Sequence, residues 1–151
     1  MPSDKSRIAI IGYGNVGRGT EYAVRQAVDM ILQGVYTRRD PYDIRTLSDA
    51  PVFNVDNFNP VDVDVAILCG GSATDLPKQG PEFASLVNTV DSFDTHKKIP
   101  DYFDLIDNAA KEAGNTCVIS TGWDPGLFSI MRLIEDSSLP NGMTYTFWGK
   151  E

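Results

Sequence analysis

The chain has 151 residues, of which 42% are hydrophobic and 23% charged, so it is long and apolar enough for one domain with a buried core. Its formal net charge of −8 argues against nucleic acid and anionic membrane surfaces as partners, because the long-range field would repel both. No segment has the length and apolarity of a membrane span or a secretion signal, and we expect a cytoplasmic protein.

The first predicted element is a buried strand at residues 8–11 that runs into a glycine-rich turn, Gly12-Tyr13-Gly14-Asn15-Val16-Gly17. A helical pattern follows from Val16 to Ala27. In such a unit the first glycine allows the tight turn, the second lets a pyrophosphate approach the backbone, and the third lets the helix pack on the strand. The unit predicts a dinucleotide site, although this glycine spacing also occurs in purely structural turns.

The second predicted strand, residues 30–36, is followed by Thr37-Arg38-Arg39. An acidic residue at this place would bind a ribose 2′-hydroxyl and exclude a 2′-phosphate, whereas two guanidiniums invert that preference. The sequence therefore predicts NADP rather than NAD as the coenzyme. The alternative is that both arginines belong to a solvated basic loop.

The remaining pattern alternates strands and helices. Residues 40–60 are rich in Pro, Asp and Asn and predict a loop with a short edge strand at 51–54. Further buried strands are predicted at 63–69, around Thr89-Val90 and at 116–120, and a helix containing Tyr102 should end at Gly114. This alternation predicts an α/β fold, a Rossmann-like doubly wound parallel sheet.

In a sheet of this kind, ligands bind beyond the carboxyl ends of the strands. The residues that follow the third, fourth and fifth buried strands are polar, glycine-bearing or both, and we expect them to meet at one edge. Cys69 and Cys117 are predicted to be core thiols, and the single histidine, His96, does not predict a metal site. Together with residues 12–17 and 37–39, the segments expected at this edge are Cys69-Gly70-Gly71-Ser72-Ala73-Thr74-Asp75, Asp91-Ser92-Phe93-Asp94 and Thr121-Gly122-Trp123-Asp124-Pro125-Gly126.

The last thirty residues change pattern. A helical stretch at 127–135 is followed by alternating apolar and polar residues at 143–148, a pattern typical of an antiparallel strand with one solvent-exposed face. We therefore expect residues 1–121 to form an incomplete dinucleotide-binding domain and residues 122–151 to begin a second, α+β domain. Because a lone strand is not a finished domain, we also expect the chain to be a fragment.

These motifs together resemble the N-terminal half of the meso-diaminopimelate dehydrogenase family, along almost the whole chain. The later segments are more selective than the glycine turn, which many unrelated oxidoreductases share. The resemblance is carried by residues 11–18, 37–39, 68–75 and 89–94, by Ser120-Thr121-Gly122-Trp123-Asp124-Pro125-Gly126, and by Thr146-Phe147-Trp148-Gly149.

The resemblance implies an NADP-dependent amino-acid dehydrogenase of lysine and cell-wall precursor metabolism. It would oxidatively deaminate the D-configured centre of meso-2,6-diaminopimelate to L-2-amino-6-oxopimelate, the open form of tetrahydrodipicolinate, and ammonia. It also implies a homodimer formed through the rest of the family chain, and coenzyme contacts from residues 70–75.

By the same resemblance, Asp94 and Asp124 bind the reacting amino group, and Trp123 and Trp148 wall the substrate. Two carboxylates suit this role, because they accept hydrogen bonds from an ammonium group and lower the cost of moving its proton. From the residues alone, Asp94 could instead cap a turn, Asp124 could be a plain turn residue, and both tryptophans could be core aromatics.

Two other functions stay open. A related oxidoreductase could act on a semialdehyde or a sugar, but it would be expected to carry a lysine or histidine as acid/base residue, and the sequence around Asp124 offers neither. A non-catalytic NADPH-binding module is the second alternative.

Overall fold

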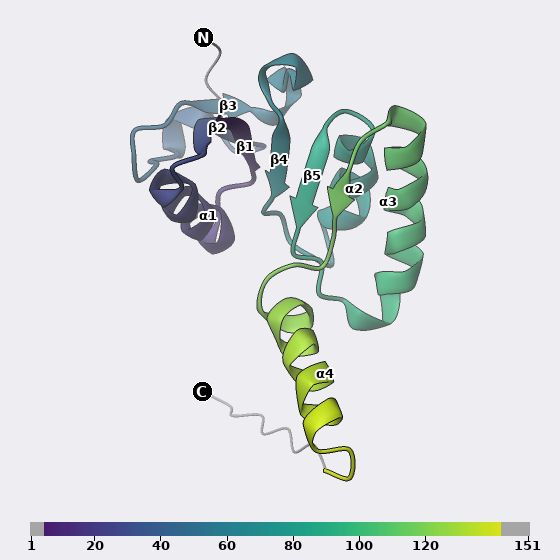
Figure 1. Ribbon diagram of the computed structural model, residues 1–151. Coiled ribbons are helices and arrows are strands. Elements are labelled where there is room, and N and C mark those ends of the chain that lie inside the picture. The colour runs from purple at the N-terminus through teal and green to yellow at the C-terminus, as the bar shows by residue number, and fades with distance from the viewer. Residues whose placement is uncertain (1–4, 143–151) are drawn as a thin grey trace.

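The computed structural model describes residues 5–142 and contains one six-stranded parallel sheet (Figure 1). The strand order is β3-β2-β1-β4-β5-β6, and every neighbouring pair is parallel. This order places the switch in winding direction between β1 and β4, as in doubly wound dinucleotide-binding sheets. The predicted fold class is confirmed. The strands are β1 (Ser6–Ile11), β2 (Met30–Thr37), β3 (Val52–Asn54), β4 (Val65–Leu68), β5 (Asn88–Asp91) and β6 (Cys117–Val118).

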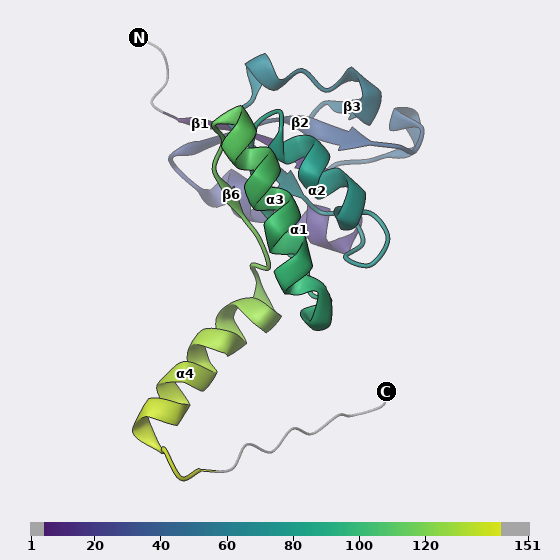
Figure 2. The same cartoon turned by 90° about the vertical axis from the view of Figure 1, so that its right-hand side faces the viewer.

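Helices cover both faces of the sheet. Helix α1 (Asn15–Gln26) lies on one face, and α2 (Leu76–Ala84) and α3 (Ile99–Ala113) lie side by side on the other (Figures 1 and 2). Successive side chains of β1 point to opposite faces. Ala9 and Ile11 therefore pack in the core beneath α2 and α3, while Ile10 packs with Tyr13, Val35 and Cys69.

The predicted ends of the elements agree with the structure where local chemistry sets them. Helix α3 ends at Gly114, whose φ of 73° is the left-handed conformation that glycine adopts at low cost. The predicted edge strand is β3. Strand β6 is shorter than the predicted 116–120, because Ser120 takes a positive φ of 57° and turns the chain out of the sheet.

Helix α4 (Phe128–Ser138) projects away from the sheet, after a kinked segment at Trp123–Leu127 in which Asp124 has an extended backbone (φ −140°, ψ 117°) (Figure 2). The structure extends this helix beyond the predicted 127–135. The predicted strand at 143–148 lies outside the described residues, as does Trp148. Cys69 is buried as predicted, whereas Cys117 is only half-buried. Within residues 5–142, no helix is both long enough and apolar enough to cross a membrane.

Candidate functional site

The glycine turn after β1 has the geometry that a pyrophosphate site requires. Gly12 has a φ of 92°, and a Cβ added at Gly17 would collide with the Gly12 carbonyl oxygen, so both positions need glycine. A Cβ at Gly14 would meet nothing within 4 Å, so the space in front of it is open. Helix α1 begins at Asn15, directly after Gly14, and no side chain caps its first amides. These amides are free to donate hydrogen bonds to an anion.

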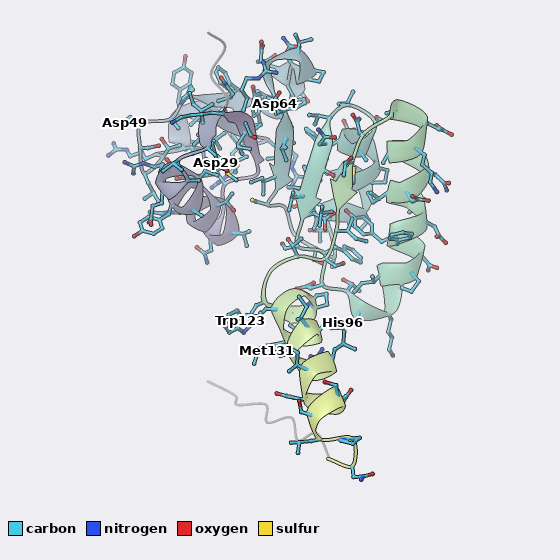
Figure 3. The ribbon with its side chains drawn as sticks, in the orientation of Figure 1. Asp29, Asp49, Asp64, His96, Trp123 and Met131 are labelled. Carbon is cyan, nitrogen blue, oxygen red and sulfur yellow. The ribbon has the colours of Figure 1, made fainter. Side chains whose placement is uncertain are left out.

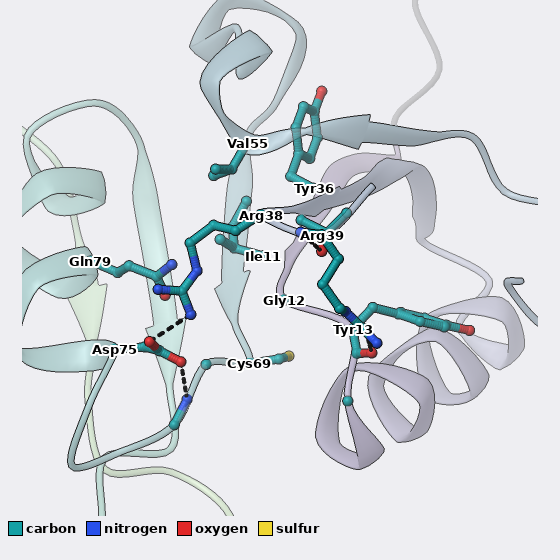
Figure 4. Close-up of a pocket in the computed structure, with 14 residues that line it drawn as sticks. Ile11, Gly12, Tyr13, Tyr36, Arg38, Arg39, Val55, Cys69, Asp75 and Gln79 are labelled. Atoms are coloured by element: carbon teal, nitrogen blue, oxygen red, sulfur yellow. Dashed lines mark hydrogen bonds and ion pairs between the residues drawn. The ribbon is translucent and has the colours of Figure 1, made fainter. Parts of the chain in front are cut away.

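A cavity of about 300 Å³ lies at the carboxyl ends of β1, β2 and β4 (Figure 4). Its walls come from the glycine turn, the end of β2 and the loop that leads into α2. A larger hollow of about 580 Å³ adjoins it and shares Arg38, Val55, Asp75 and Gln79. The first cavity is lined by residues 11–14, 36–39 and 69–71 and by Val55, Asp75 and Gln79.

Most of the predicted coenzyme residues meet at this cavity: Gly12, Tyr13, Gly14, Thr37, Arg38, Arg39, Cys69, Gly70, Gly71 and Asp75 all line it. Thr74 lines the neighbouring hollow instead. Asn15, Val16, Gly17, Ser72 and Ala73 do not line the cavity, and they lie in the adjoining turn, helix start and loop. The loops after β1, β2 and β4 therefore meet at one edge of the sheet, as the sequence predicted, but the sequence did not determine which side chains face the cavity.

The two arginines at the end of β2 point in different directions (Figure 4). Arg38 Nη2 lies 2.7 Å from Asp75 Oδ1, across the cavity, while Arg39 donates a hydrogen bond to the backbone oxygen of Tyr13. Thr37 is buried, and its Oγ1 accepts a hydrogen bond of 3.1 Å from the Arg39 amide. The guanidiniums thus occupy two separate places at the cavity.

The carboxylate of Asp75 holds the loop before α2 in place through its contacts with Gly71 and Arg38. Its Oδ2 accepts a 2.9 Å hydrogen bond from the Gly71 amide. That bond, together with Arg38, holds the pKa of the Asp75 carboxyl below its usual range, although partial burial works in the opposite direction. Nearby, Gln79 Oε1 is buried and has no hydrogen-bond partner among the described residues. The wall of the cavity therefore contains a buried acceptor that no described residue satisfies.

The sequence analysis missed a buried carboxylate behind the glycine turn. Glu21 of α1 is fully buried and accepts hydrogen bonds from the Tyr13 hydroxyl, from Ser48 Oγ, and from the amides of Leu47 (3.0 Å) and Ser48 (2.9 Å). It thereby ties the loop 41–50 to the glycine turn. A glutamate on an otherwise amphipathic helix gave no local signal of burial, because its partners lie at position 13 and at 47–48.

Three of the predicted substrate residues, Asp94, Trp123 and Asp124, lie in the segments that follow β5 and β6, at the same edge of the sheet, and Trp148 lies outside the described residues. The Asp94 amide donates a 2.9 Å hydrogen bond to Ser72 Oγ, which joins the loop after β5 to the loop after β4. Asp124 Oδ1 lies 3.0 Å from Arg132 Nη2 of α4 and 3.9 Å from His96 Nε2. Trp123 is largely exposed in the segment that precedes α4 (Figure 3). Its ring packs on that of Phe128, the first residue of α4.

The position of His96 corrects one expectation. The sequence around Asp124 contains no lysine or histidine, but the fold brings His96 beside it, from a segment nearly thirty residues earlier. The argument that no such acid/base residue stands near Asp124 was therefore wrong. Among residues 5–142, no three His, Cys, Asp or Glu side chains gather into a group that could hold a metal ion.

Sequence comparisons point to one family. The profile described as "Diaminopimelic acid dehydrogenase C-terminal domain" matches residues 122–151. The meso-diaminopimelate D-dehydrogenase of Lysinibacillus sphaericus is 57% identical over 145 residues, which cover 95% of this chain and 44% of that protein. The enzyme of that name from Corynebacterium glutamicum is 46% identical, again over 95% of this chain and 44% of the relative. The resemblance to the meso-diaminopimelate dehydrogenases is confirmed.

Solved structures agree with this relationship. The diaminopimelate dehydrogenase of C. glutamicum in complex with DAP superimposes with a TM-score of 0.86 at 44% identity, over 97% of this chain and 45% of that chain. An engineered D-amino acid dehydrogenase bound to NADP⁺ gives a TM-score of 0.82, also at 44% identity, over 89% of this chain and 41% of its own. The chain thus spans about half the length of the meso-diaminopimelate dehydrogenases that it matches.

Proposed function

We propose that this chain provides the NADP-binding region and part of the substrate site of a meso-diaminopimelate dehydrogenase. The observation that carries the proposal is the cavity that joins the glycine turn to Thr37-Arg38-Arg39, in a chain at least 40% identical to five relatives of that name. The reaction would be the oxidative deamination of the substrate to L-2-amino-6-oxopimelate and ammonia. Residues 1–121 would form the dinucleotide-binding domain, and residues 122–151 would begin the substrate and dimerisation domain.

The residues of the cavity fit NADP. The open space in front of Gly14 and the uncapped amides of α1 suit a pyrophosphate, and the arginines after β2 suit a phosphate on the ribose. Gln79 lines both the cavity and the larger hollow, and its side chain would stand beside a base or ribose bound there. Bound NADP⁺ would accept the hydride that leaves the substrate carbon.

The chain's own contribution to the chemistry would come from the loops after β5 and β6. Asp94 and Asp124 would accept hydrogen bonds from the substrate ammonium group, orient it and help to remove its proton. Arg132 Nη2 lies 3.0 Å from Asp124 Oδ1 and His96 Nε2 lies 3.9 Å from it, so both side chains would help to hold the carboxylate in place. Trp123, with Trp148, would cover the substrate and exclude water. The cytoplasmic location and the homodimer remain predictions.

A turnover assay tests this proposal. The full-length protein is mixed with NADP⁺ and with the meso, L,L or D,D isomer of diaminopimelate. The absorbance of the reduced coenzyme is then followed over time. We expect reduction with the meso isomer. Binding of NADP⁺ by calorimetry without turnover of any isomer would instead favour a non-catalytic NADPH-binding module. Turnover of a semialdehyde or sugar alone would favour the related oxidoreductase.

A further inference from the structure

Ser72 belongs to the loop between β4 and α2, but it does not line the coenzyme cavity, whereas Gly70, Gly71 and Asp75 of the same loop do. The loop is a tight turn, because the Gly71 carbonyl oxygen accepts hydrogen bonds of 2.8–3.3 Å from the amides of residues 74–76. The Asp75 carboxylate closes the turn with its 2.9 Å hydrogen bond from the Gly71 amide. Ser72 therefore stands on a backbone that several hydrogen bonds fix.

The hydroxyl of Ser72 reaches the loop that follows the neighbouring strand. Ser72 Oγ accepts a 2.9 Å hydrogen bond from the Asp94 amide, and Thr95 Oγ1 lies 3.4 Å from the same oxygen. Strands β4 and β5 are adjacent and parallel, so their carboxyl ends bring the two loops together. Within residues 5–142, this is the only hydrogen bond that the Asp94 amide donates.

The backbone of Asp94 is held in place while its carboxylate is left open. The preceding residue, Phe93, is 1% exposed, and its amide donates a 2.9 Å hydrogen bond to Asp91 Oδ1. Asp94 itself is exposed, and its carboxylate makes no hydrogen bond or ion pair with any residue that the structure describes. The buried Phe93 and the hydroxyl of Ser72 thus fix the point from which a free carboxylate extends.

We infer that Ser72 is a positioning residue for the substrate, which acts through the backbone of Asp94, and that its hydroxyl does not bind the coenzyme. This role sets Ser72 apart from the rest of residues 70–75, for which the family resemblance implies coenzyme contacts. The inference rests on the proposed function, in which Asp94 accepts a hydrogen bond from the substrate ammonium group. The position of such an acceptor matters, because a displacement of about 1 Å can lower a rate by about 10²-fold.

The test compares the full-length wild type with Ser72→Ala. At saturating NADP⁺, the variant should lose about tenfold in kcat/KM for meso-diaminopimelate, the scale of one neutral hydrogen bond, while the calorimetric Kd for NADP⁺ stays unchanged. The matched control is Ser85→Ala, which removes an exposed serine hydroxyl that bonds only to the Glu82 carbonyl oxygen of its own helix turn. This control should match the wild type in both measurements.

A double-mutant cycle shows whether Ser72 acts through Asp94. The activities of Asp94→Ala and of the double variant Ser72→Ala/Asp94→Ala are measured at high enzyme concentration. Because the carboxylate that Ser72 positions is already gone, Ser72→Ala should lower kcat/KM by less than about twofold in the Asp94→Ala background. A general loss of stability would instead lower the activity equally in both backgrounds.

The outcomes separate this inference from the proposed function. A wild type that turns over no isomer contradicts the proposed function, and the inference falls with it. An active wild type whose kcat/KM is unchanged in Ser72→Ala overturns the inference alone. A weaker Kd for NADP⁺ in Ser72→Ala, with kcat/KM unchanged at saturating coenzyme, overturns it by placing the hydroxyl in the coenzyme site. Additive losses in the double variant overturn it as well, because Ser72 would then act independently of Asp94.

Discussion

The hydroxyl of Tyr102 donates a 2.6 Å hydrogen bond to Oδ2 of Asp91, and both residues are 2% exposed. The other carboxylate oxygen of Asp91 accepts hydrogen bonds from the amides of Phe93 (2.9 Å) and Ser120 (3.0 Å). One buried carboxylate thus joins α3 to the loops after β5 and β6. Those loops carry Asp94 and Asp124, so Asp91 fixes the backbone close to both residues proposed to bind the substrate, although it does not line the coenzyme cavity.

Replacing Tyr102 by Phe should destabilise the protein. The variant keeps the ring that stacks on Phe93 at a centroid distance of 4.1 Å, but it leaves Asp91 Oδ2 buried without its donor. We expect a loss of about 1–3 kcal/mol in the free energy of unfolding, measured by urea denaturation. Tyr42→Phe is the control, because Tyr42 is 96% exposed and should be neutral. Equal stability of both variants would show that the Asp91 contact contributes nothing.

Glu21 should make stability depend on pH in the acid range. Burial raises the pKa of Glu21, but hydrogen bonds from Ser48, Tyr13 and Leu47 outweigh it, and the net pKa is lowered. A carboxyl whose pKa is lower in the folded than in the unfolded state stabilises the fold above its unfolded pKa of about 4.3, and this stabilisation is lost as the pH falls through the folded pKa.

The corresponding measurement compares the wild type with Glu21→Gln by urea denaturation between neutral and acidic pH. The variant should be less stable near neutrality by about 1–3 kcal/mol, and the difference should shrink as the pH falls below the unfolded pKa. Glu112→Gln removes an exposed glutamate of α3 and serves as the control. A constant difference across the pH range would contradict the role of Glu21. Tyr13, whose pKa burial and Glu21 raise to about 12, should stay protonated where exposed tyrosines ionise.

Two glycines of the turn should respond differently to alanine. A Cβ at Gly17 collides with the Gly12 carbonyl oxygen, so Gly17→Ala should shift the turn and destabilise the fold by about 2 kcal/mol or more. A Cβ at Gly14 meets no protein atom and points into open space at the cavity. Gly14→Ala should therefore cost less than about 1 kcal/mol in stability yet weaken NADP⁺ binding at least about tenfold, as measured by thermal denaturation and calorimetry. Unchanged affinity in Gly14→Ala would place the pyrophosphate elsewhere.

Replacing Asp124 by Asn should lower the turnover number and leave the affinity for NADP⁺ unchanged. Asp124→Asn keeps the size of the side chain but removes the charge proposed to hold the substrate ammonium group. Given the usual effect of a general acid–base group, we expect kcat to fall by about 10²-fold or more, with the Kd for NADP⁺ unchanged. Asp107→Asn, at a half-buried aspartate of α3 that pairs with Lys111, is the control for loss of one carboxylate. A fully active Asp124→Asn enzyme would remove Asp124 from the mechanism.

The sequence by itself determined the features that depend on neighbours along the chain. Strand and helix order follow from local periodicity, the turn from Gly12 and Gly17, and the end of α3 from Gly114. The parallel sheet then follows, because alternating strands and helices have few ways to bury their apolar faces.

Only the tertiary structure decided which side chains act together. Arg38 and Arg39 are adjacent in sequence, yet one pairs with Asp75 and the other donates to Tyr13. Buried Glu21 receives hydrogen bonds from Leu47 and Ser48, which lie more than twenty residues later in the chain, and His96 comes close to Asp124 only because two loops meet. Each of these contacts joins residues well apart in the chain. Their energies depend on distance, burial and partners in space, which local sequence patterns do not encode.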